Sequence, residues 1–223
     1  EVEILANALR NSGLQEGDRV AGFLPNIPEA IIAMLATASI GAIWSASSPD
    51  FGIKGVLDRF SQIKPKFLFA ANGYFYDGKL FDSLEKLRGI LEDLPSVKKV
   101  ILIPYTKKDF DTSNISHAFY YEDFVDRNNY DNLVFNQLPF NHPLYIMYSS
   151  GTTGLPKSIV HSAGGTLIQH LKELNLHVDL GLDDTIFYFT TCGWMMWNWL
   201  VSSLAIGATV VLYDGSPLHP DSS

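Results

Sequence analysis

Segments with the apolar pattern of β-strands alternate with segments of helical periodicity along most of the chain, and this alternation constrains the fold more than any other feature. A helix-type run at residues 28–39 separates strand-type runs at 19–24 and 42–45. Pro28 can open the helix, because proline fits the first helical turn. The same order recurs further along the chain. Such alternation is typical of parallel βαβ units, so the sequence predicts an α/β fold.

The alternation weakens in the middle of the chain, which suggests two lobes. A predicted helix at residues 80–94 and a predicted strand at 99–103 precede a polar, aromatic-rich region. Regular alternation resumes after it, with strands, helices and turns in close succession. We therefore expect a first α/β lobe at about residues 1–140 and the start of a second lobe at about 141–223.

Composition excludes some functions. The 223 residues are 47% hydrophobic and carry a formal net charge of −8, so binding to a nucleic-acid backbone is not expected. Cys192 is the only cysteine, which excludes an internal disulfide and favours a reducing compartment; we expect a cytoplasmic protein with a buried, structural thiol. Two uncharged stretches, at residues 30–49 and 185–213, reach the length of a membrane span. Their serine, threonine and glycine content favours buried elements of an α/β core, so no membrane span is expected.

The ends of the chain suggest a piece of a longer polypeptide. Glu1 already lies in a helical pattern, and the last eight residues form a loop-type segment. We expect the remainder of a parent chain to be missing.

A loop rich in glycine and hydroxyl groups follows the predicted strand at residues 144–149. Glycines let successive backbone N–H groups converge on an anion, and short hydroxyl side chains add donors without bulk. Lys157 supplies a point charge at the end of the loop. The groups of this loop that could together hold a triphosphate are Ser149, Ser150, Gly151, Thr152, Thr153, Gly154 and Lys157.

The P-loop of kinases and GTPases is a rival interpretation of this segment, since Gly151 begins a similar spacing. Proline stands at 156 where the P-loop needs its second glycine, and proline lacks the N–H group and fixes φ. The segment after Lys157 also has a strand pattern, whereas a P-loop opens a helix. The P-loop interpretation therefore fails, both because of the proline and because of the strand pattern.

Residues 148–157 resemble the signature loop of the adenylate-forming superfamily, which includes acyl-CoA synthetases, luciferases and peptide-synthetase adenylation domains. The chain departs from that signature at Ser158, where glycine is usual. The resemblance implies that the chain is part of the large N-terminal domain of such an enzyme. It further implies ATP with Mg²⁺ and CoA as co-substrates, and an acyl-adenylate as intermediate.

Further stretches resemble the acetyl- and acetoacetyl-CoA synthetase branch of that superfamily. Residues 48–52 and Arg59 match this branch, in which the arginine is associated with CoA phosphates; a solvated helix arginine is the alternative. The segment from Gly193 onward resembles the start of the acyl-binding pocket of this branch. The resemblance implies an acyl pocket at Trp194, Met195 and Met196 and favours acetoacetate as the acid. Core packing is the alternative for this tryptophan- and methionine-rich segment.

The function implied is that of an acetoacetate–CoA ligase fragment. Other short-chain acyl-CoA synthetases, acting on acetate, propionate or butyrate, remain alternatives, as does a non-catalytic nucleotide-binding module. Superfamily motifs for adenine, magnesium and the adenylation lysine are not found in the sequence, so we expect the isolated piece to be inactive.

Overall fold

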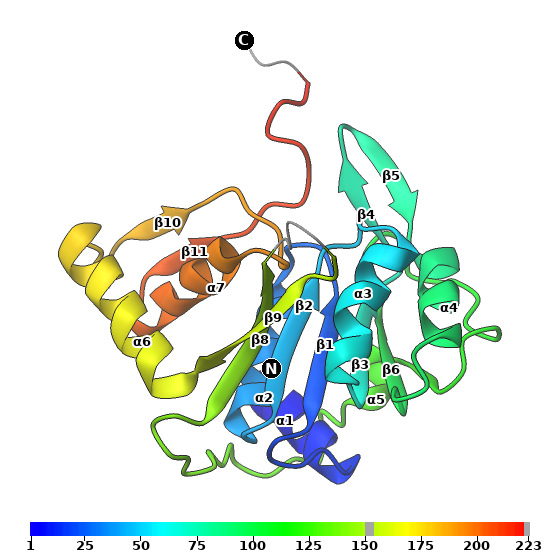
Figure 1. Cartoon of the computed structure of the whole chain (residues 1–223), viewed down its shortest axis with the longest axis horizontal. Helices are drawn as coiled ribbons and strands as arrows, with labels where there is room; N and C mark the ends of the chain where they lie inside the picture. Colours follow the sequence, from blue (N-terminus) through cyan, green and yellow to red (C-terminus); the bar gives the residue numbers. More distant parts are fainter. Residues whose placement is uncertain (150–153, 221–223) are drawn as a thin grey trace.

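The strands of the chain build a twisted, mostly parallel sheet (Figure 1). The computed structural model describes residues 1–149 and 154–220. Within these residues, the main sheet has the strand order β7 (Ala118–Tyr120), β6 (Lys99–Ile103), β3 (Phe67–Ala71), β1 (Arg19–Phe23), β2 (Ile43–Ser47), β8 (Pro143–Ser149) and β9 (Lys157–Ser162). All neighbouring strands are parallel except β8 and β9, which pair antiparallel. The expected α/β fold is confirmed.

Helices cover both faces of this sheet. Helices α1 (Val2–Asn11) and α2 (Pro28–Ser39) share one hydrophobic core with the sheet, and α3 (Ile53–Ile63) and α4 (Leu84–Glu92) share a second core. Residues on alternate sides of a strand enter different cores: Val20 belongs to the first and Ala21 to the second. The short helix α5 (Tyr121–Phe124) packs against the first core. The result is a three-layer α/β/α arrangement.

The buried face of α3 explains why this segment forms a helix at its place. Val56, Phe60 and Ile63 are buried and recur at a spacing of four and three residues, which places them on one side of the helix. The helix ends at Lys64, which takes a left-handed conformation (φ 49°). This helix is therefore anchored to the second core along its whole length.

The predicted helix at residues 80–94 was wrong in its first part. A β-hairpin occupies this region, formed by β4 (Gly73–Tyr76) and β5 (Lys79–Asp82), and α4 begins only at Leu84. The hairpin turn consists of Asp77 and Gly78, both with positive φ (50° and 68°). An Asp-Gly pair is a strong signal for such a two-residue turn, and the three consecutive aromatic residues before it are of a type favoured in strands.

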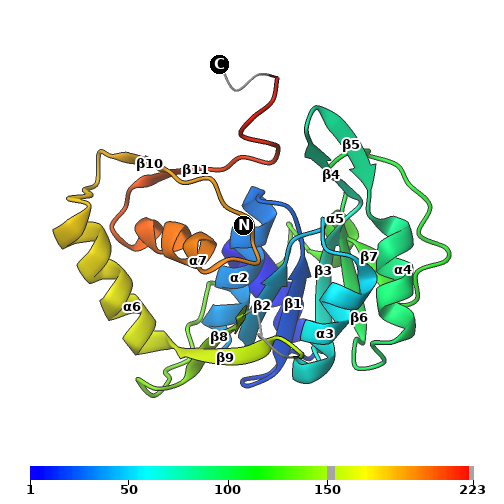
Figure 2. The same ribbon diagram turned by 45° about the horizontal axis from the view of Figure 1, so that its top comes forward.

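A smaller unit lies beyond the β9 edge of the main sheet (Figures 1 and 2). Its two short parallel strands are β10 (Thr185–Phe187) and β11 (Thr209–Val211). Its helical segments are α6 (Ala163–Lys172), the π-helical η1 (Glu173–His177), α7 (Met195–Ser202) and the 3₁₀ turn η2 (Ser203–Ala205). A small core of its own contains Leu174, Ile186 and Leu200. Helix α7 also contributes Trp197 and Val201 to the first core of the main sheet.

The main sheet continues across residue 140, because β8 pairs with β2.

The two uncharged stretches noted in the sequence form elements of the α/β core. The first forms α2 and β2, and the second forms β10, α7 and β11. Among the described residues, no helix combines the length and apolar character needed to cross a membrane.

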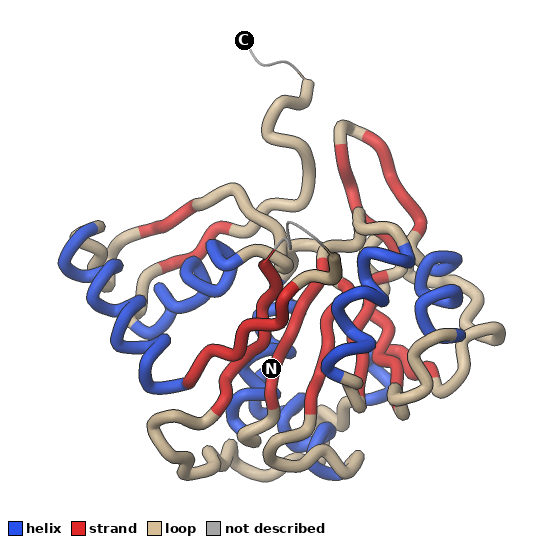
Figure 3. Tube along the Cα trace, in the orientation of Figure 1, coloured by secondary structure: helices blue, strands red, loops and turns tan. Residues whose placement is uncertain are grey.

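The carboxyl ends of the main strands are where the fold can bind a ligand. The chain passes from β1 to β2 on one side and then to β3 on the other, so the strand order reverses around β1. In open α/β sheets, ligands bind outside the carboxyl ends of the strands at such a reversal. The hairpin β4–β5 and the chain after β11 extend beyond this end of the sheet (Figure 3).

Candidate functional site

The antiparallel strands β8 and β9 form the stem of the predicted phosphate loop. Ser149 and Lys157 are paired residues in the register of these strands, so the structure brings two of the predicted phosphate-binding residues together at the mouth of the loop. Gly154 has a φ of 136°, a value that glycine adopts far more readily than other residues. Lys157 is exposed. The predicted residues Ser150, Gly151, Thr152 and Thr153 lie outside the described residues.

Tyr148 ties the start of the loop to the layers around it. Its hydroxyl donates to the carbonyl oxygen of Arg59 in α3 (3.2 Å) and lies 3.4 Å from the hydroxyl of Ser45 in β2. Burial raises the pKa of Tyr148 to about 12, because the phenolate would lose its hydration. The hydroxyl therefore stays protonated and keeps donating near neutral pH.

A cavity of about 570 Å³ opens beside the loop stem. It collects residues from three predicted sites: Arg59 from the CoA site, Ser149 from the phosphate loop, and Trp194 with Met195 from the acyl pocket. The sequence had separated these residues by as much as 136 positions. Lys157, Gly154 and Met196 are not among its lining residues. The remaining lining residues are Phe51, Met147, Tyr148, Ile159, His161 and Gly193.

Arg59 lies in this cavity with its guanidinium between two aromatic rings. The guanidinium carbon is 4.6 Å from the ring centroid of Phe51 and 5.8 Å from that of Tyr148. Its Nη1 donates to the carbonyl of Gly55, one helical turn earlier (2.6 Å). Cation–π contacts hold a guanidinium in place while leaving its other donors available. Arg59 is therefore half-buried and oriented, in contrast to a solvated helix arginine.

The tryptophans and methionines of the 193–199 segment divide into two groups. Trp194 and Met195 are 65% and 47% exposed and border the cavity, whereas Trp197 is fully buried. The indole N–H of Trp197 donates to the side-chain oxygen of Asn26 (2.9 Å). Core packing is thus the correct interpretation for Trp197, and Met196 is half-buried beside it.

Cys192 is buried, as expected, and its thiol donates to the carbonyl of Pro25 (3.2 Å). Burial raises the pKa of this thiol well above its usual range. A thiol that stays protonated is a poor nucleophile, so the structural assignment is supported.

His161 lines the same cavity of about 570 Å³. Its ring packs against Tyr145, with 5.2 Å between the centroids. Burial lowers the pKa of His161 below its ordinary value. Because His161 follows the loop by only a few residues, the sequence indicates that it could approach the nucleotide, and the antiparallel pairing of β8 and β9 places it in the lining of the cavity.

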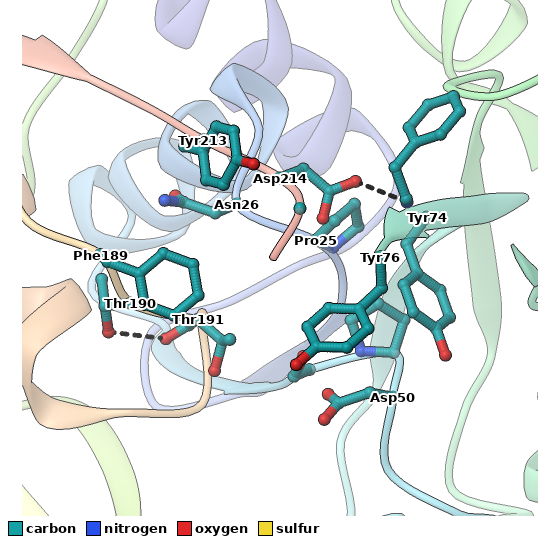
Figure 4. A pocket seen from close by; sticks show the side chains of 14 residues that line it. Pro25, Asn26, Asp50, Tyr74, Tyr76, Phe189, Thr190, Thr191, Tyr213 and Asp214 are labelled. Carbon is teal, nitrogen blue, oxygen red and sulfur yellow. Dashed lines mark hydrogen bonds between the residues drawn. The ribbon is translucent and has the colours of Figure 1, made fainter. Parts of the chain in front are cut away.

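A second, smaller cavity of about 60 Å³ lies at the reversal of strand order, outside the carboxyl ends of β1, β2 and β3. Figure 4 shows Phe189 and Tyr213 on one side of it and Tyr74 and Tyr76 on the other. Asp214 also lines it and accepts a hydrogen bond from the backbone N–H of Phe75 (2.8 Å).

Burial raises the pKa of Asp214 above its ordinary value. Sequence reasoning missed this aromatic cavity because it missed the β4–β5 hairpin.

No group of three or more potential metal ligands (His, Cys, Asp or Glu) occurs among residues 1–149 and 154–220.

The family model described as AMP-binding enzyme matches residues 1–223, the whole chain. The chain belongs to the AMP-binding enzyme family. This confirms the resemblance to adenylate-forming enzymes that the loop sequence predicts. Three curated relatives of this AMP-binding chain are named acetoacetyl-CoA synthetase or acetoacetyl-coenzyme A synthetase. The relative from Danio rerio is 56% identical over 229 residues, that from Gallus gallus 58% over 224, and that from Rhizobium meliloti (strain 1021) 53% over 221.

These alignments cover 98–100% of this chain but 34% of each relative, so the chain spans about a third of their length. A solved structure, acetoacetyl-CoA synthetase from Streptomyces lividans, superimposes with a TM-score of 0.92 at 48% identity. It is covered over 33% of its chain, and this chain over 99%. The α/β arrangement of this AMP-binding chain is therefore also that of a solved relative.

Proposed function

We propose that the protein to which this chain belongs is an acetoacetate–CoA ligase, which activates acetoacetate with ATP and transfers it to CoA. One observation carries the proposal: a single cavity of about 570 Å³ joins Arg59 and Ser149 to Trp194 and Met195. These residues match three different subsites of an acyl-CoA synthetase. The names of the relatives, which are 53–58% identical to this chain, support acetoacetate as the acid.

The reaction proceeds in two displacements. A carboxylate oxygen of acetoacetate attacks the α-phosphorus of ATP, the bond from that phosphorus to the bridging oxygen breaks, and pyrophosphate leaves. The sulfur of CoA then attacks the acyl carbon of the adenylate, AMP leaves, and the thiol proton passes to solvent. Phosphoryl-type transfers depend mainly on positioning and on stabilising charge that moves to the leaving group.

The chain supplies part of this machinery. Backbone and hydroxyl donors of residues 149–154 bind the β- and γ-phosphates, and Lys157 neutralises charge on the departing pyrophosphate. Arg59, held by its aromatic neighbours, pairs with a phosphate of CoA. Trp194 and Met195, which line the cavity, enclose the acid, whereas Met196 does not line it and takes no part in enclosing the acid. Mg²⁺ would be supplied with the nucleotide as MgATP and would neutralise charge on the phosphates.

The proposal also covers the cellular location, the metabolic role and the lobes of the protein. We place the enzyme in the cytoplasm, in ketone-body and lipid metabolism, with small molecules as its partners. The division into a first lobe at about residues 1–140 and the start of a second at about 141–223 stays a prediction, in which β8 and β9 of the second lobe extend the sheet of the first. The 223-residue chain alone is expected to be inactive, because it spans about a third of the relatives. Acetoacetate-dependent exchange of pyrophosphate into ATP by the isolated chain would contradict that expectation.

Thioester formation by the full-length protein with a panel of short acids tests the proposal. Acetoacetate should give the highest kcat/KM, above acetate, propionate and butyrate. Equal values for acetate and acetoacetate would support a general short-chain synthetase instead. If no acid yields a thioester or an adenylate while ATP still binds, the protein is a non-catalytic nucleotide-binding module.

A further inference from the structure

Gln62, at the end of α3, contacts the chain on both sides of Lys157. Its side-chain nitrogen donates to the carbonyl oxygen of Pro156 (2.9 Å), and its side-chain oxygen accepts from the hydroxyl of Ser158 (2.9 Å). One amide group thus engages the residue before and the residue after the lysine. The partners lie 94 and 96 positions away in sequence, so these contacts join distant parts of the chain.

The same helix holds the opposite strand of the loop stem. Tyr148 and Ser158 are paired residues in the β8–β9 register. Tyr148 donates to the carbonyl of Arg59, and Ser158 donates to Gln62, one turn further along α3. Residues of helix α3 therefore accept hydrogen bonds from both members of a cross-strand pair at the base of the loop. Its own position is fixed by Phe60, which is fully buried in the second core.

We propose that Gln62 is a positioning residue for the adenylation step, because it fixes the backbone of Lys157 at the end of the phosphate loop. This inference rests on the proposed function. A lysine ammonium on four methylene groups stabilises a departing phosphate only where its backbone starts from the right place, and small misplacements of catalytic groups are costly. Gln62 does not touch the nucleotide in this proposal. It acts through Pro156 and Ser158.

The test measures acetoacetate-dependent ATP–pyrophosphate exchange by the full-length protein with Gln62→Ala. The variant loses both contacts, together with a hydrogen bond from the same side-chain nitrogen to the carbonyl of Asp58 in its own helix (2.6 Å). We expect kcat/KM for ATP to fall about three- to tenfold, the equivalent of one net hydrogen bond. The KM values for acetoacetate and CoA and the midpoint of thermal unfolding should stay unchanged. Gln169→Ala is the matched control, since Gln169 is also exposed on a helix with a side-chain hydrogen bond, to Glu173 (3.0 Å).

Two further variants separate the contacts of Gln62. Gln62→Glu keeps an acceptor for Ser158 but loses the donor to Pro156, and Ser158→Ala removes only the other contact. Ser158→Ala should give a smaller loss than Gln62→Ala. Gln62→Glu should lose at least as much as Gln62→Ala, because its carboxylate would face the carbonyl oxygens of Pro156 and Asp58. Adding Ser158→Ala to Gln62→Ala should cause little further loss, because the partner of that hydroxyl is already gone.

The outcomes distinguish this proposal from the proposed function. If the unaltered protein shows no exchange with any acid, the proposed function fails whatever Gln62 does. If it is active and Gln62→Ala leaves kcat/KM for ATP unchanged, the positioning role is overturned. A lowered unfolding midpoint with equal losses for all three substrates also overturns it, because that result indicates a structural role alone. Should Gln62→Ala not fold, Gln62→Glu and Ser158→Ala decide by the same criteria.

Discussion

Met195 and Met196 are neighbours in sequence but differ in their surroundings, and this difference can be measured. Met195 begins α7 and borders the large cavity, whereas Met196 does not. Replacing Met195 by tryptophan fills part of the proposed acid subsite. We expect the loss in kcat/KM to be larger for acetoacetate and butyrate than for acetate, by about 10- to 200-fold, the usual worth of one methylene in a tight pocket. Thioester formation by the full-length protein measures it.

Met196→Trp is the matched control for this prediction. It adds the same indole one position later, on a residue that does not line the cavity. An acid preference unchanged in Met196→Trp and altered in Met195→Trp supports the cavity as the acid subsite. An unchanged preference in Met195→Trp would remove Met195 from that subsite.

How far the sequence could predict single residues depended on the kind of signal. Local patterns marked the stem residues Ser149 and Lys157, and their pairing follows from two short strands joined by a loop. The sequence does not decide whether Trp197 packs in the core or lines the acyl pocket, because its partner Asn26 lies 171 positions away. The contacts of Gln62 could not be predicted at all, since an exposed helix glutamine carries no sequence signal for a partner in another strand.

Among the elements, strands β1 and β2 pack closely where Gly22 of β1 lies against the indole of Trp44 in β2. A Cβ added at Gly22 would lie 2.7 Å from Cζ2 and 2.8 Å from Cη2 of Trp44. Both belong to a rigid, buried indole, so the neighbour cannot yield easily. Gly22→Ala should lower the free energy of unfolding by about 1–3 kcal/mol, as overpacking does in well-packed cores. Urea unfolding followed by tryptophan fluorescence or circular dichroism measures the loss.

Two controls show whether overpacking is the cause. In the Trp44→Phe background the smaller ring gives room, so the additional loss from Gly22→Ala should shrink. Gly55→Ala, inside α3, meets nothing closer than 3.9 Å. It should raise the free energy of unfolding by about 0.5–1 kcal/mol, because alanine favours a helix over glycine. A loss for Gly22→Ala that stays the same without the indole would contradict the packing explanation.

The elements of the fold could be predicted where periodicity was long and unbroken. The helix at 28–39 and the strand at 19–24 agree with α2 and β1 to within one residue. The hairpin β4–β5 was missed because its strands are four residues each and the apolar residues around Leu84 extend the helical pattern backwards. Its aromatic cavity was missed with it, since that cavity needs the hairpin and the chain after β11 together.

In the molecule as a whole, the unit containing β10, β11, α6 and α7 is attached to the main sheet through few buried polar contacts. The indole of Trp197 donates to Asn26, and the thiol of Cys192 donates to Pro25, directly after β1. Trp197→Phe would leave the buried oxygen of Asn26 without this donor. We expect a loss of about 1–3 kcal/mol for the stranded acceptor, in addition to the cost of the lost ring volume. Urea unfolding of the protein measures the total.

Hydrogen exchange shows whether the loss is confined to the attachment. Amides of α7 and of β10–β11 should exchange faster in Trp197→Phe, while those of β1 and β3 keep their protection, because regions of a protein can open separately. The double variant Trp197→Phe with Asn26→Leu removes both polar partners and should recover part of the stability. Equal acceleration across the main sheet would mean that the unit and the sheet unfold together. In that case the two hydrophobic cores that share α7, rather than the Asn26 contact, hold the unit in place.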